Sequence, residues 1–155
     1  MLRRSLPSPA DELHCWLPRP GSPLSGLRAE LRQLLTESRD HTHPVDSAVM
    51  FGVPLAATEL ISNAWQHGRP PVKLRLLRTN TSFIIDVVDH HPGAPPAPRP
   101  LRWSPSDGYG LHLIRHVASM CGWTEALLSK HIWASFHIDA SRAWRRGFDI
   151  NAPLL

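Results

Sequence analysis

The sequence predicts an α/β (α+β) fold, a two-layer sandwich whose mostly antiparallel mixed sheet is covered on one face by helices. Two long segments with apolar residues at helical spacing come before two pairs of strand patterns. The full order of elements, β-α-α-β-β-loop-α-β-β, favours separate layers of strands and helices. With 155 residues, of which 42% are hydrophobic, the chain suits one domain with one core.

The first part of the chain predicts a lead-in, a strand and a helix. Residues 1–11 are rich in proline, serine and charge, and we expect them to be flexible. The apolar run from Leu13 to Leu17 ends at Pro18 and predicts an edge strand. Over residues 24–39, leucines recur at helical spacing with charged residues on the other face, which indicates an amphipathic helix.

A second helix is expected over residues 46–67. Asp46 or Ser47 can cap its start, and Gly68, which is followed by prolines, ends it. Pro54 lies inside this span and lacks the N–H group that a helix interior needs. We therefore expect Pro54 either to kink the helix or to start a new one.

The second half of the chain predicts two hairpins with a helix between them. Residues 72–77 alternate with period two and residues 82–88 form a mostly apolar run, so together they predict an antiparallel hairpin. Residues 110–121 have helical periodicity. A last hairpin is expected from residues 123–128 and 132–138.

Two segments predict no regular structure. The stretch from His90 to Pro105 is rich in proline and breaks any helix or strand. A loop of this length inside a compact domain is usually functional or disordered. The tail at 139–155 is basic and then apolar, and it stays unassigned. The domain is therefore expected to span residues 12–138.

Charge and composition disfavour several functions. The net charge is +4, and 15 of the 17 basic residues are arginines scattered along the chain (17 less Lys73 and Lys130). No interleaving of aromatic and basic residues typical of a nucleic-acid module is present, so direct nucleic-acid binding is not expected. No apolar run approaches the ~20 residues of a membrane span. Cys15 and Cys121 are isolated and suit reduced thiols, so we expect a cytoplasmic protein.

Glu59 and Asn63 are the first candidate functional residues. They are spaced i, i+4 on the second predicted helix, so they share one face beside its apolar stripe. An amide oxygen and phosphate oxygens together suit Mg²⁺, and a carboxylate one turn away can act on a hydroxyl or water. The alternative is that both residues are solvated groups on the helix surface.

Asp89 and two glycines form the second candidate set. Asp89 ends an apolar strand, where its carboxylate can accept a hydrogen bond from an adenine amino group. Gly108 and Gly110 come before a predicted helix, where backbone N–H groups can approach a phosphate. Each has a structural alternative, because an aspartate before prolines and a G-x-G sequence also occur in ordinary turns.

Four segments, in order, resemble the motifs of the GHKL ATPases, which include DNA gyrase and sensor histidine kinases. The first is similar to the N box, and more narrowly to that of bacterial anti-sigma factor kinases and their actinobacterial relatives. The next two are similar to the first and second glycine boxes, and the last resembles the closing hairpin. The resemblance covers roughly residues 12–138 and is carried by these segments: Glu59-Leu-Ile-Ser-Asn63-Ala-Trp-Gln-His67-Gly68, Asp86-Val-Val-Asp89-His-His-Pro-Gly93, Asp107-Gly108-Tyr-Gly110-Leu111 and Lys130-His-Ile-Trp133-Ala-Ser-Phe136.

The resemblance implies an ATP site with Mg²⁺. In it, Asn63 holds the metal, Glu59 is the catalytic base and Asp89 binds adenine. The segment from His90 to Ser106 is the ATP lid, and either Lys130 or Arg115 is a candidate to neutralise the γ-phosphate. The nucleotide-binding set implied by the resemblance also includes Gly93, Gly108, Gly110 and Leu111.

The resemblance also implies a function and partners. Anti-sigma factors of this kind hold a sigma factor inactive and phosphorylate Ser or Thr of an anti-anti-sigma antagonist, and some are homodimers. We therefore expect an ATP-dependent serine/threonine kinase that controls a sigma factor. The first glycine box departs from the usual D-x-G-x-G, since Gly93 is its one plausible glycine and prolines replace the rest. The alternative is a non-catalytic module that binds ATP or a partner.

Overall fold

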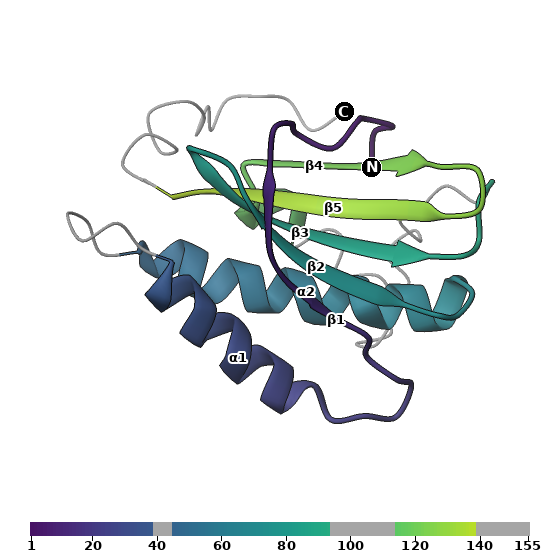
Figure 1. Ribbon diagram of the computed structural model, residues 1–155, viewed down its shortest axis with the longest axis horizontal. Helices are drawn as coiled ribbons and strands as arrows, with labels where there is room; N and C mark the ends of the chain where they lie inside the picture. Colours follow the sequence, from purple (N-terminus) through teal and green to yellow (C-terminus); the bar gives the residue numbers. More distant parts are fainter. Residues whose placement is uncertain (39–44, 94–113, 139–155) are drawn as a thin grey trace.

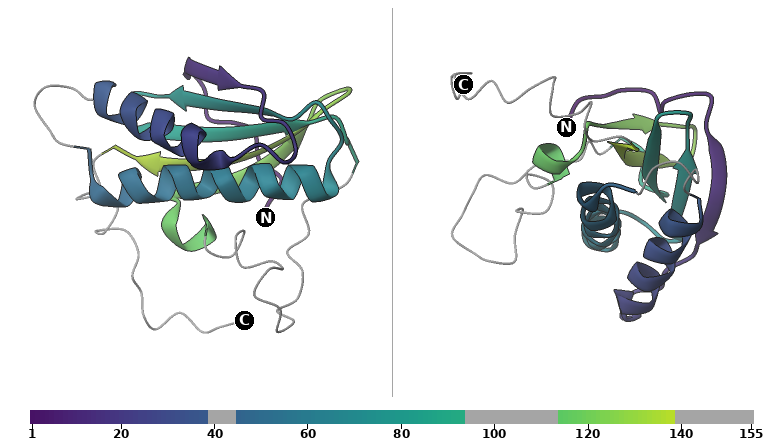
Figure 2. Two further views of the ribbon diagram at one scale, coloured as in Figure 1. Left: turned by 90° about the horizontal axis from the view of Figure 1, so that it is seen from below. Right: turned by 90° about the vertical axis from the view of Figure 1, so that its left-hand side faces the viewer.

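A computed structural model describes residues 1–38, 45–93 and 114–138. Five strands form one sheet in the order β1-β2-β3-β5-β4, and every neighbouring pair is antiparallel. Both helices lie on the same face of this sheet (Figures 1 and 2). The predicted two-layer sandwich is therefore confirmed. The elements are β1 Asp11–Trp16, α1 Leu24–Glu37, α2 Ser47–His67, β2 Lys73–Arg78, β3 Ser82–Asp89, β4 Met120–Glu125 and β5 Lys130–His137.

Helix α2 is the long central helix and runs without interruption past Pro54. Asp46 is its N-cap, and its side chain accepts a hydrogen bond from the N–H of Ala48 at 2.7 Å. Gly68 is the C-cap, as expected, and donates its N–H to the carbonyl of Ala64. Pro54 is buried in this helix, so it neither ends α2 nor starts a new helix there.

The core lies between the helices and the inner face of the sheet. Helix α1 contributes Leu31 and Leu35, and α2 contributes the apolar face that runs along β3 and β5. Removal of this apolar surface from water is the main stabilising contribution to the fold. The buried members of this cluster are Leu31, Leu35, Val49, Val53, Ala56, Ala57, Leu60, Ile61, Ala64, Val72, Leu74, Leu76, Phe83, Ile85, Val87, Ile114, Trp123, Ile132, Ala134 and Phe136.

The N-terminal segment, residues 1–10, crosses the outer face of the sheet, opposite the helices. It begins beside β4, where the N–H of Arg4 donates to the carbonyl of Trp123 and Trp123 donates to Leu2 (Figure 1). Further along, Leu6 and Ala10 pack on a second apolar cluster made of Leu77, Ile84 and Trp133. The segment expected as a lead-in therefore covers part of the sheet before β1 begins.

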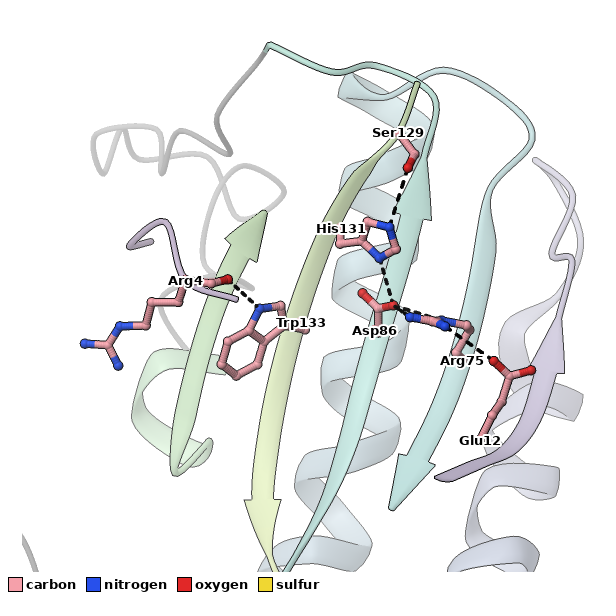
Figure 3. A network of polar contacts seen from close by, with 7 residues as sticks. All are labelled: Arg4, Glu12, Arg75, Asp86, Ser129, His131 and Trp133. Atoms are coloured by element: carbon pink, nitrogen blue, oxygen red, sulfur yellow. Dashed lines mark hydrogen bonds and ion pairs between the residues drawn. The ribbon is translucent and has the colours of Figure 1, made fainter. Parts of the chain in front are cut away.

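A buried polar network lies next to that cluster on the outer face (Figure 3). Asp86 is fully buried, and its Oδ2 accepts hydrogen bonds from Arg75 Nε at 2.9 Å and from His131 at 3.1 Å. Because the carboxylate accepts, the Nδ1 of His131 carries the hydrogen. Burial acts to lower the pKa of Arg75, but hydrogen bonds and charges of Asp86 and Glu12 outweigh it and raise that pKa.

The predicted helix over residues 110–121 was wrong at its C-terminal end. Only one helical turn, at 114–117, lies in the described part of this range, and β4 already begins at Met120. The reason is pairing with β5: Ser119 donates its N–H and its hydroxyl to the carbonyl of Ser135, which draws the chain into the sheet. Cys121 consequently lies in β4, at the sheet edge opposite the Cys15 of β1, and burial raises the pKa of its thiol.

The last predicted strand pair is shifted along the sequence for the same reason. The expected strand at 123–128 begins and ends three residues earlier, at Met120–Glu125. The N–H of Ala126 donates to the carbonyl of Ser129 and closes the hairpin turn. Leu127 and Leu128 are therefore exposed at the tip of this hairpin.

No helix in the described part of the chain is long and apolar enough to cross a membrane.

Two helical glycines give a paired test of this packing. A Cβ at Gly52 of α2 would lie 2.8 Å from a ring carbon of the buried Phe136, whereas a Cβ at Gly26 of α1 would meet open space. Gly52→Ala should lower the free energy of unfolding by about 1–3 kcal/mol through overpacking. Gly26→Ala should raise it by up to about 1 kcal/mol through helix propensity.

The measurement is urea unfolding followed by circular dichroism, with both variants compared at one temperature. Equal stability of the Gly52→Ala variant and the wild type would contradict the close contact between α2 and β5.

Candidate functional site

Asp89 ends β3 on the inner face of the sheet, under the end of α2. Its side chain is buried, with 0% of the residue exposed. One oxygen, Oδ1, accepts the N–H of His91 at 2.8 Å. The other, Oδ2, lies 3.3 Å from the ammonium nitrogen of Lys130, the register partner of Asp89 on β5. This Oδ2 has no hydrogen-bond partner within the part of the chain that the structure describes.

Gly68 allows the end of α2 to press against this carboxylate. A Cβ at Gly68 would lie 2.7 Å from Asp89 Cγ and 2.8 Å from its Oδ2, closer than real Cβ contacts. A side chain at position 68 would therefore push the helix end away. The carbonyl groups at a helix C-terminus carry partial negative charge, which disfavours a nearby carboxylate. The ammonium of Lys130 offsets that repulsion.

Two histidines bind the end of β3 to the turn that follows α2. His90 donates its N–H to the carbonyl of Arg69 at 2.9 Å, and its Nδ1 lies 3.1 Å from the carbonyl of Pro71. The Nδ1 of His91 lies 3.0 Å from the carbonyl of His67. Carbonyl groups only accept, so Nδ1 carries the hydrogen in both rings. His91 therefore satisfies one of the free carbonyl groups at the C-terminal end of α2.

Gly93 is held by a residue that the motifs did not indicate. It adopts φ +83°, a conformation that favours glycine, and its N–H donates to Glu125 Oε1 at 3.0 Å. The other oxygen of Glu125 accepts a hydrogen bond from Arg3 at 3.0 Å. Glu125 thus connects the predicted nucleotide residue Gly93 with the N-terminal segment.

Glu59 and Asn63 lie on the side of α2 that faces β5. They continue the ridge of Gly52 and Ala56, and Gly52 contacts Phe136 of β5. Both side chains are partly exposed. Figure 2 shows α2 between α1 on one side and the turn at 114–117 on the other. The two residues therefore face away from α1.

The rise along the helix orders these groups with respect to Asp89. At 1.5 Å per residue, Asn63 lies about 6 Å and Glu59 about 12 Å along the axis from the last helical residue, His67. Asp89 lies at that same end, in contact with Gly68. A long ligand that follows α2 can therefore meet Asp89 with one end, and Asn63 and Glu59 with the other.

The second candidate glycine set falls in a part of the chain that the structure does not describe. Gly108, Gly110 and Leu111 lie outside the described residues, as does most of the predicted lid. The described chain resumes at Ile114, whose side chain is fully buried in the core. The turn at 114–117 is closed by a hydrogen bond from the N–H of Ala118 to the carbonyl of Ile114.

The sequence matches the histidine kinase-like ATPase domain over residues 24–135, and the chain belongs to that family. None of the curated proteins matches the sequence significantly. Membership of this family implies binding of ATP, usually with Mg²⁺. The GHKL-type resemblance of the motifs is therefore confirmed at the level of the domain.

The residues around Asp89 fit an adenine nucleotide. The buried Oδ2 is an acceptor that lacks a hydrogen-bond partner, and it lies where the end of α2 packs against the carboxylate at Gly68. An adenine amino group supplies the donor that this oxygen lacks. Asn63 can contribute one oxygen to Mg²⁺, which commonly takes its remaining ligands from phosphates and water.

Three residues of this site escaped the motif analysis in whole or in part. Gly68 was expected only as a helix stop, although a glycine beside a strand-end aspartate also permits close packing. Lys130 was a candidate for the γ-phosphate, but the structure pairs it with Asp89 at the opposite end of the candidate site. Glu125 carried no sequence signal, because its partner Gly93 lies on a distant segment.

Removal of the Glu125 carboxylate should release the Gly93 amide. Loss of a hydrogen bond of about 1 kcal/mol corresponds to about fivefold faster amide exchange at Gly93 in the Glu125→Ala variant. Arg3→Ala is the control, because it removes an exposed ion pair worth about 0–1 kcal/mol and leaves the Gly93 contact in place. Hydrogen exchange followed by NMR measures both. Unchanged Gly93 exchange in Glu125→Ala would show that this contact does not form in solution.

Proposed function

We propose that this protein is an ATP-dependent regulatory kinase of the anti-sigma type, which phosphorylates Ser or Thr of an anti-anti-sigma antagonist. The observation that supports it best is Asp89: a buried carboxylate with an unpartnered oxygen, in contact with Gly68 at the end of α2. This arrangement suits adenine at one end of a nucleotide. Asn63 and Glu59 then follow along the helix toward the phosphates.

Each proposed site residue has one role. Asp89 accepts a hydrogen bond from the adenine amino group, and Asn63 would hold the Mg²⁺. The N–H groups of Gly108, Gly110 and Leu111 bind nucleotide oxygens, whereas Gly93, whose N–H is donated to Glu125, contributes the shape of the main chain to the nucleotide site. The bound metal supplies charge neutralisation at the phosphates, which is most of what phosphoryl transfer requires from a site.

Glu59 is the proposed base. It takes the proton from the hydroxyl of the antagonist's Ser or Thr while that oxygen bonds to the γ-phosphorus and the bond to the ADP oxygen breaks. Glu59 lies one helical turn before Asn63, on the same side of α2. A hydroxyl presented by a partner protein can therefore lie next to both the carboxylate and the metal.

The proposed partners are proteins. A sigma factor would be held by the regulator, and the anti-anti-sigma antagonist would be its phosphorylation substrate. Helix α1, which packs on α2 and leaves an outward polar face, is the proposed surface for a partner or for a possible homodimer. The arginine-rich composition, with 15 arginines and two lysines, supports an actinobacterial type.

A non-catalytic ATP-binding or partner-binding module is the second candidate function. Counted from Asp89, Gly93 stands at the second glycine of D-x-G-x-G and His91, not a proline as expected above, stands at the first. The Nδ1 of its ring donates a hydrogen bond to the carbonyl of His67, the last residue of α2. A side chain in that position favours a changed nucleotide site, in which binding persists without transfer.

We expect ATP to bind in a Mg²⁺-dependent manner. Asn63→Ala should remove the metal-dependent part of the affinity, and Asp89→Asn should weaken discrimination between adenine and guanine nucleotides, because an amide also presents a donor. Isothermal titration calorimetry with and without Mg²⁺ measures both effects, with circular dichroism as the control for folding. A well-folded protein that binds no nucleotide at millimolar ATP would defeat this proposal.

We expect phosphate transfer to a cognate antagonist domain, and Glu59→Gln should slow it by about 10²–10⁴-fold, the usual contribution of a general base. The measurement uses radiolabelled ATP and follows label on the antagonist. Equal rates for wild type and Glu59→Gln would show that Glu59 is not the base. If neither transfers phosphate while both bind ATP, the binding module is the correct function.

A further inference from the structure

The pair formed by Lys130 and Asp89 is the most deeply buried ion pair in the described residues. Their side chains are 2% and 1% exposed, and the ammonium nitrogen lies 3.3 Å from Oδ2. They are register partners on β5 and β3, so both backbones fix where the side chains begin. The other lysine of the chain, Lys73, is exposed at the start of β2.

Stability alone does not explain this pair. The cost of removing two charges from water usually equals or exceeds their mutual attraction, so an apolar pair of similar size would serve as well. The hydrogen bonding is also incomplete. An ammonium has three N–H donors, yet among the described residues Asp89 is the polar group that it contacts. The Asp89 Oδ2 in turn lacks a hydrogen-bond partner.

A ligand that hydrogen-bonds to both the Lys130 ammonium and Asp89 Oδ2 must present an acceptor and a donor side by side. The Watson–Crick edge of adenine does so, because its N1 accepts and its neighbouring 6-amino group donates. Gly68 lets the carboxylate lie directly against the end of α2, because a Cβ there would collide with Asp89 Cγ and Oδ2. The ATP binding implied by the family selects adenine among the bases.

We propose that Lys130 determines base specificity by donating a hydrogen bond to adenine N1 while Asp89 accepts from the 6-amino group. This inference rests on the proposed ATP binding and adds a second base-reading residue to it. Guanine in the same position would present its O6 acceptor to the carboxylate and its N1–H donor to the ammonium. Both interactions would then be unfavourable, so the pair rejects guanine.

The test compares ATP with 1-deaza-ATP, in which a C–H replaces N1. The wild type should bind 1-deaza-ATP about tenfold more weakly or worse, because a hydrogen bond to a charged donor is lost. It should bind GTP about a hundredfold more weakly than ATP. Calorimetry on the unmodified protein gives both ratios, so this part of the test does not depend on a variant that folds.

Variants then assign the N1 contact to Lys130. In Lys130→Met, ATP and 1-deaza-ATP should bind equally, whereas Lys130→Gln, which keeps a neutral donor, should restore part of the preference. Lys73→Met is the matched control and should keep the wild-type ratio. Circular dichroism checks folding, because loss of Lys130 leaves the Asp89 carboxylate unpaired.

Three results would overturn the inference. A wild-type protein that binds ATP and 1-deaza-ATP equally well removes the N1 contact while leaving ATP binding intact. A preference for ATP that persists in folded Lys130→Met assigns that contact to another group. Binding of GTP as tightly as ATP shows that the pair does not select adenine. A folded wild type that binds none of the three nucleotides defeats the proposed function together with this inference.

Discussion

The packing of α2 along β3 and β5 is the constraint from which the candidate site follows. The helix buries an apolar face from Val49 to Ala64, and the contact of Gly52 with Phe136 fixes its distance from β5. With that register set, the helix ends at Gly68, against the carboxylate of Asp89. The same packing turns the side of the helix that carries Glu59 and Asn63 toward β5. The position of α2 therefore determines both the core and the candidate site. A shift of α2 by one turn would move Gly68 away from Asp89.

Strand β3 carries two fully buried aspartates whose environments differ because they lie on opposite faces of the sheet. Asp86 points outward, and its Oδ2 accepts hydrogen bonds from both Arg75 and His131. Asp89 points inward and has one backbone donor and one ammonium near it. A carboxylate already surrounded by a guanidinium and an imidazole suits a structural role, in which it joins β2, β3 and β5. Each carboxylate keeps one oxygen without a hydrogen-bond partner, so what distinguishes Asp89 is its position at the strand end beside α2, where it is the candidate for ligand binding.

The sequence predicted the helices and the hairpins well because their signals are local. The cap at Asp46, the stop at Gly68 and the alternation in β2 all act within a few residues. It failed at residues 118–121, where apolar spacing alone cannot distinguish a helix from a strand and pairing with β5 decides. For the site, the motifs indicated Asp89, Glu59 and Asn63. They could not indicate Glu125, or the pairing of Lys130 with Asp89, because those contacts join distant segments and exist only after the sheet has formed.

The first glycine box departs from the family motif beside Asp89, at one end of the candidate site. His91 stands at the first glycine of D-x-G-x-G, and its ring is bound to the last carbonyl group of α2. Lys130 brings a charge to the same end. Asn63 and Glu59, by contrast, match the N box, and they lie about one to two turns away along the helix. In the proposed function, changes beside Asp89 alter nucleotide recognition, whereas phosphate transfer depends on Asn63 and Glu59. The proposed nucleotide recognition and the proposed phosphoryl transfer therefore rest on different residues, and the changed first glycine box leaves the candidate residues Asn63 and Glu59 in place.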